Sequence, residues 1–174
     1  MPRIELVTQP MTPPGTTVNG DWPLAAPSRG LRRIPLRRLT CFLRVPPIPG
    51  AKRAIIDTGA PLTYFPHQVW ANEFNWREGR DFDILPVVGN PPLVGQTLSS
   101  LYAFRLARLR VPIFLAGRDL TGPRLQIDSL VTQLCEPGGP PVILLGLWGG
   151  VLDGRRLAFG SAHDGDPSAA LEWE

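Results

Sequence analysis

The chain has 174 residues, of which 43% are hydrophobic, so it is long enough for one domain with a core of its own. Eighteen basic and fifteen acidic side chains leave a formal net charge of only +3, which singles out neither nucleic acid nor a membrane surface as a partner. Twenty-one prolines and eighteen glycines disfavour long helices, and the longest apolar run, residues 142–152, is shorter than the ~20 residues that span a bilayer.

Residues 1–33 are rich in Pro, Thr, Gly and Ser without sustained periodicity, so we expect an extended or disordered Pro-rich N-terminal arm. Five arginines lie within residues 29–38. Such a cluster can bind nucleic acid, but it is also typical of a solvated strand edge, which is the interpretation that we prefer. We expect the folded domain to span residues 34–162 and an acidic, mobile tail to occupy residues 163–174.

The next segment predicts a hairpin that ends at Asp57. Residues 39–45 have the apolar pattern of a strand, PPIPGA is a turn, and residues 53–56 form a second strand. Pro66 stands at a plausible first helical position, so we expect a short helix over residues 66–74.

Residues 102–111 carry the strongest alternation of apolar with other side chains, which predicts a half-buried antiparallel strand. Glycines at positions 89 and 95 predict a projecting loop before it.

Three further segments follow. Residues 124–135 predict a strand or a strand and turn, residues 140–146 a fully apolar strand that stops at a glycine, and residues 155–160 a last short strand. A second short helix is expected over residues 147–152, although two glycines weaken it. The sequence as a whole predicts a mainly β fold with one or two short helices, in which the sheet closes or rolls into a barrel.

The stretch AIIDTGA, residues 54–60, combines side chains that suit an active-site loop. Asp57 follows a strand and can face a cleft, and Thr58 carries a hydroxyl that can tie one loop to another. Gly59 permits a sharp turn that brings backbone N–H groups close to the carboxylate, and Ala60 is small enough not to block that approach. A simpler alternative is a structural aspartate in an Asx-type turn at the end of a strand.

Ile55 and Ile56 precede this aspartate, and we expect both to anchor the loop in the core. A second stretch, VILLGLWGGVLDGRRLAF at residues 142–159, places an apolar strand before a glycine. In this order the two stretches resemble the retropepsin family, the single-domain aspartic proteases of retroviral type, over about residues 36–160. The resemblance implies a retropepsin-like, closed or rolled β-barrel, equivalent to one lobe of the acid-protease fold.

The resemblance also implies an aspartic endopeptidase whose catalytic loop is Asp57, Thr58 and Gly59. Water attack on an amide needs a base and an acid, and two close carboxylates supply both by sharing one proton. The chain contains one Asp-Thr-Gly, so the second carboxylate is expected from Asp57 of another subunit in a homodimer. No metal or organic cofactor is implied.

The family closes a flap hairpin over a peptide or protein substrate, and the best candidate here is residues 93–100, where Gly95 gives mobility. A second candidate for the flap tip is Gly89. The expected substrate-binding residues are Ala60, Val94, Gly95, Gln96 and Thr97.

The residues after Gly146 depart from the family, which often places Arg or Asn there, whereas this chain has Leu147 and Trp148. This departure motivates a second hypothesis, a catalytically inactive retropepsin-like module that dimerises or binds peptides. A third hypothesis is a small basic β-barrel that binds nucleic acid through residues 29–38, with binding that weakens steeply as salt rises.

Cys41 and Cys135 form no CxxC pair, and His67 and His163 lack the spacing of metal ligands, so we expect no metal site. We expect two reduced thiols, although the count also allows one disulfide. The first residues lack the basic and apolar regions of a signal peptide, so the expected protein is cytoplasmic and binds neither nucleic acid nor membrane.

Overall fold

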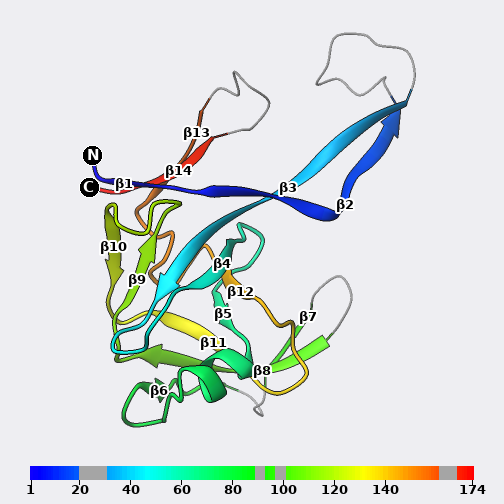
Figure 1. The fold of residues 1–174 in the computed structure, drawn as a ribbon. Helices are drawn as coiled ribbons and strands as arrows, with labels where there is room; N and C mark the ends of the chain where they lie inside the picture. Colours follow the sequence, from blue (N-terminus) through cyan, green and yellow to red (C-terminus); the bar gives the residue numbers. More distant parts are fainter. Residues whose placement is uncertain (20–30, 89–92, 97–100, 161–167) are drawn as a thin grey trace.

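The computed structural model describes residues 1–19, 31–88, 93–96, 101–160 and 168–174, with the backbone alone for 10–19 and 31–37. The chain is mainly β, as the sequence predicts (Figure 1). Among these residues, no helix is long and apolar enough to cross a membrane. The strands are β1 (Arg3–Glu5), β2 (Val7–Asn19), β3 (Leu31–Arg44), β4 (Lys52–Ile56), β5 (Thr63–Phe65), β6 (Phe82–Ile84), β7 (Leu93–Gln96), β8 (Leu101–Leu109), β9 (Ile113–Ala116), β10 (Arg124–Ile127), β11 (Val131–Cys135), β12 (Ile143–Leu145), β13 (Arg156–Phe159) and β14 (Ala169–Glu172).

Most of the described strands belong to one sheet that curls into a half-barrel. Its strand order is β10-β9-β3-β4-β12-β5-β11-β8-β6, with β2 added beside β3 and β7 beside β8. The predicted hairpin is confirmed as the antiparallel pair β3 and β4, in which Leu39 lies opposite Ile56. The first of these strands begins earlier than expected, at Leu31, because it also pairs with β2.

The strand β12 lies between β4 and β5. These two strands flank residues 57–62, which we call the Asp57 loop. The strand β12 runs parallel to β4, with Leu145 opposite Ile56, and it pairs with β5 where Leu144 lies opposite Tyr64. A segment far downstream in the sequence therefore holds the Asp57 loop from within the sheet. The apolar strand predicted over residues 140–146 is confirmed in this element.

One short helix, η1 (Gln68–Glu73), occurs among the described elements and buries the side chains of Val69 and Trp70. It is π-helical, with the Phe74 N–H donating to the Val69 carbonyl at 2.8 Å, and it confirms the helix predicted over 66–74. The Trp70 indole N–H donates to the Cys135 carbonyl at 2.8 Å, which ties the helix to β11.

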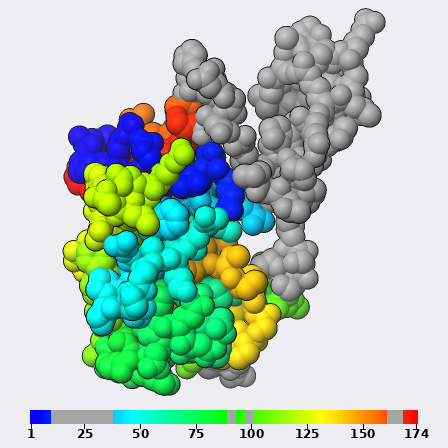
Figure 2. Space-filling model, viewed as in Figure 1, coloured from blue at the N-terminus to red at the C-terminus, as the bar shows by residue number. Residues whose placement is uncertain are grey.

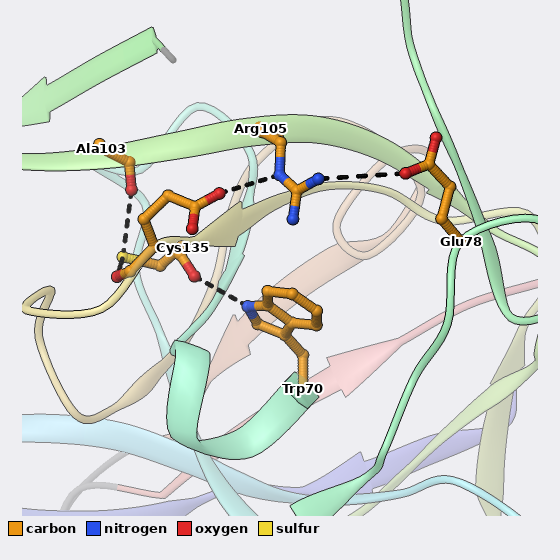
Figure 3. A network of polar contacts seen from close by, with 6 residues as sticks. Trp70, Glu78, Ala103, Arg105 and Cys135 are labelled. Carbon is orange, nitrogen blue, oxygen red and sulfur yellow. Dashed lines mark hydrogen bonds and ion pairs between the residues drawn. The ribbon is translucent and has the colours of Figure 1, made fainter. Parts of the chain in front are cut away.

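The guanidinium of Arg105 completes this anchor (Figure 3). It lies 5.8 Å from the centre of the Trp70 ring, 2.9 Å from the Glu136 carboxylate and 4.0 Å from that of Glu78. The contacts join η1 to β8 and β11, the two strands that form one wall of the cleft described below.

The prediction of a second short helix over residues 147–152 is wrong. Gly149 and Gly150 have φ angles of 87° and 119°, in the left-handed region that a right-handed helix does not use. The Gly149 carbonyl instead accepts a bond of 2.9 Å from the Val131 N–H, so the segment forms turns that pack against β11.

The two ends of the chain lie side by side in a separate three-stranded sheet, β1-β14-β13 (Figures 1 and 2). Ile4 lies opposite Leu171, and both side chains are buried. The prediction that the C-terminal tail is mobile is therefore wrong for residues 169–172, which form β14. Part of the expected N-terminal arm forms β1 and β2. The domain boundaries themselves remain predictions.

Candidate active site

Asp57 lies directly after β4, at the point where the chain leaves the sheet. Its own N–H donates to the Leu145 carbonyl of β12 at 3.0 Å, which continues the ladder by one step. The Ile56 side chain before it is buried in the core. The backbone of Asp57 is thus fixed, while its side chain is only partly buried.

A tight turn follows Asp57 and returns backbone donors to it. The Gly59 N–H donates to Asp57 Oδ1 at 2.9 Å, and the Ala60 N–H donates to the Asp57 carbonyl at 3.1 Å. A Cβ at Gly59 would lie 3.3 Å from Asp57 Oδ1, so glycine lets the amide approach without crowding the carboxylate. Thr58 is exposed at the outer side of the turn.

The segment after β12 is bonded along the far side of this loop. The Leu147 N–H donates to the Ala60 carbonyl at 3.0 Å, and the Trp148 N–H donates to the Pro61 carbonyl at 2.9 Å. A Cβ at Gly146 would lie 2.4 Å from the carbonyl carbon of Leu62, so only glycine fits there. The two sequence stretches that carry the family resemblance therefore meet at one place.

The Asp57 loop borders a cleft of about 940 Å³. Most of its walls are apolar or aromatic, with two glutamines, and the charged side chains among its lining residues are Asp57 and Arg38. The lining residues are Arg38, Ile55, Asp57, Gly59, Ala60, Pro61, Leu62, Tyr64, Gln96, Tyr102, Gln133, Pro140, Val142 and Leu144.

Two tyrosines, Tyr64 and Tyr102, also line the cleft. The rings of Tyr64 and Tyr102 meet edge to face with their centres 5.1 Å apart. The Tyr64 hydroxyl donates to the Pro140 carbonyl at 3.0 Å, and the Tyr102 hydroxyl donates to Gln133 Oε1 at 3.3 Å. Burial raises the pKa of both phenols, and the Asp57 carboxylate adds to the rise in the pKa of Tyr102, so both stay protonated at neutral pH.

Of the expected flap, residues 93–96 form β7, which pairs antiparallel with β8 so that Gly95 lies opposite Tyr102. A Cβ at Gly95 would lie 2.5 Å from Tyr102 Cζ, so this glycine makes room for the aromatic ring. Gln96 lines the cleft, whereas Val94 is exposed and does not. Thr97 and the second candidate tip, Gly89, lie outside the described residues.

The expected site residues are thus brought together only in part. Four of them surround the cleft: Asp57, Gly59, Ala60 and Gln96. Thr58, Val94 and Gly95 are described but are not among its lining residues. The expectation that Ile55 anchors the core is wrong, because its side chain is only partly buried and lines the cleft; Ile56 alone of the pair is buried.

Sequence reasoning missed Arg38, Tyr102 and Gln133 as cleft residues. Arg38 could have been found by extending the register of the predicted hairpin by one step beyond Leu39 opposite Ile56. The tyrosine and the glutamine come from β8 and β11, and no local signal showed that these strands pair beside the Asp57 loop.

Other candidate groups lie elsewhere. Cys41 and Cys135 are both buried and free. His67 packs edge to face against Trp70 at 5.2 Å, outside the cleft lining, and His163 lies outside the described residues. The side chains of residues 29–37 also lie outside what the structure describes, so the proposed nucleic-acid patch stays a prediction.

No protein-family model matches the chain, and no curated protein matches it either.

Proposed function

We propose that this chain is a retropepsin-like aspartic endopeptidase that acts as a homodimer. The observation that carries the proposal is the Asp57 carboxylate, which a glycine turn holds at the border of a cleft large enough for a peptide. The fixed backbone on both sides of the turn supports it, because a reacting carboxylate needs a defined position.

The chemistry requires a second carboxylate. Asp57 is the only acidic side chain among the described residues that line the cleft. Two close carboxylates share one proton, so that the ionised one takes a proton from water and the protonated one donates to the peptide carbonyl oxygen. In the proposed dimer Asp57 of a second copy supplies this partner across a two-fold axis. Thr58, exposed beside Asp57, is then available to bond the partner's loop.

The walls suit an extended peptide. Pro61, Val142 and Leu144 offer apolar contacts, and the amides of Gln96 and Gln133 offer donors and acceptors for a peptide backbone. The β7–β8 pair covers the substrate in this proposal.

Proteolysis tests the proposal. The wild type, Asp57→Asn and Asp153→Asn would be incubated with a diverse peptide pool from about pH 4 to about pH 7, and products identified by mass spectrometry. Asp153 is the matched control because it is exposed and lies outside the cleft lining. We expect cuts by the wild type and Asp153→Asn that vanish with Asp57→Asn. Cuts that persist with folded Asp57→Asn would contradict the proposal.

The second candidate is a catalytically inactive module that binds peptides. It is favoured by the bond between the Gly59 N–H and Asp57 Oδ1, which a purely structural aspartate would also make. Peptides that bind but are never cut, with the wild type and Asp57→Ala alike, would favour this function over the enzyme.

A further inference from the structure

Arg38 and Asp57 lie one step beyond the last pair of the ladder between β3 and β4. Leu39 of β3 pairs with Ile56 of β4, so the next antiparallel step sets Arg38 opposite Asp57. The two residues both line the cleft, and Arg38 is exposed. A basic side chain thus borders the same space as the carboxylate that we propose to be catalytic.

The surroundings of Arg38 leave it suited to a ligand. It is the only basic side chain among the described residues that line the cleft. A guanidinium beside apolar walls binds a carboxylate through two parallel N–H donors, and this geometry discriminates a carboxylate from a neutral amide.

We propose that Arg38 selects peptides that carry Glu or Asp within about two residues of the bond to be cut. Residues that face each other on neighbouring strands are about 5 Å apart at Cα, roughly the spacing of one to two residues in an extended peptide. The inference rests on the proposed function. In the homodimer each subunit supplies one Arg38, so an acidic residue on either side of the bond meets a guanidinium.

Two peptide pools test the selection. They are identical and degenerate except for one fixed central residue, Glu in one and Gln in the other. We expect the wild type to cut the Glu pool with a kcat/KM about fivefold higher, as an ion pair at an exposed site allows. The ratio should fall toward one in Arg38→Met and as salt rises, because salt screens exposed charges.

Charge reversal makes the test specific. Arg38→Glu should favour a third pool with Lys at the centre over the Glu pool. Arg124→Met is the matched control, since Arg124 is an exposed arginine of β10 outside the cleft lining, and it should keep the wild-type ratio. A Glu preference that survives in folded Arg38→Met would overturn the inference. So would an equal loss of activity on both pools, because Arg38 would then support the fold or the dimer.

Binding separates this inference from the proposed function. The affinity of Asp57→Asn for the Glu and Gln pools needs no cleavage. If Asp57→Asn binds the Glu pool more tightly than the Gln pool, and the double variant Asp57→Asn, Arg38→Met does not, the role of Arg38 is upheld even if the wild type cuts nothing. Equal affinity for both pools, from a protein that does cut peptides, would refute the role of Arg38 and leave the protease proposal standing.

Discussion

At Asp57 the chain passes from a buried strand to an exposed turn within two residues. A carboxylate that is partly withdrawn from water needs hydrogen bonds, and the Gly59 N–H supplies one from the same turn. This arrangement is local, so the tripeptide alone predicts it. The neighbours across the cleft are not local, and Tyr102 and Gln133 were not predictable from their own segments.

Cys41 shows how burial changes the chemistry of a single side chain. It is fully buried in β3 opposite Ala54, and burial raises the pKa of its thiol from 9.0 to about 12. The folded protein therefore keeps a proton that the unfolded chain loses above about pH 9. The contribution of the protonated Cys41 thiol to the free energy of unfolding is fully present below about pH 9 and is lost as the pH rises toward the pKa of the thiol in the folded protein.

We predict that the free energy of unfolding of the wild type falls between about pH 8 and about pH 10.5 by about 2 kcal/mol more than that of Cys41→Ala. Urea titrations of both proteins at the two pH values measure the difference. Parallel falls in the two proteins would show that the Cys41 thiol does not carry this pH dependence.

The strand β12 is the element that joins the two halves of the site. Its apolar run and terminal glycine predict a strand that ends near residue 146, and this is confirmed. Its insertion between β4 and β5 could not be predicted from the residues, because a three-residue strand carries no signal that selects its partners. The same reason explains the missed strands β1 and β14, which are short and pair with each other across the whole chain.

Gly146 offers a test of this insertion. In Gly146→Ala the new methyl group would meet the Leu62 backbone at 2.4 Å, and backbone cannot swing aside as a flexible side chain can. We predict a loss of about 3 kcal/mol or more in the free energy of unfolding, measured by urea denaturation.

Gly122→Ala is the matched control for this substitution. Its Cβ would make only an ordinary contact, 3.4 Å from the Asp119 carbonyl oxygen, so we expect a change within about 0.5 kcal/mol. Equal effects of the two substitutions would contradict the tight packing of β12 against the Asp57 loop.

At the scale of the whole molecule, the described residues provide one Asp57 loop, a cleft beside it, and the β7–β8 pair as the candidate flap. The two termini form a small sheet of their own, whereas the Asp57 loop follows β4, an interior strand of the larger sheet. The mainly β character followed from composition and alternation. Neither composition nor alternation predicts a dimer. We propose the dimer because the reaction needs a second carboxylate.

The most direct measurement is therefore the activity of a purified heterodimer. Subunits with two different affinity tags, one wild type and one Asp57→Asn, would be coexpressed and selected by both tags. If the two Asp57 side chains form one site, this heterodimer should be at least about a hundredfold less active than the wild-type dimer, because one carboxylate cannot act as both acid and base. A matched heterodimer with one Asp153→Asn subunit should keep full activity. Half of the wild-type activity in the Asp57→Asn heterodimer would show that each subunit works alone and would contradict the account.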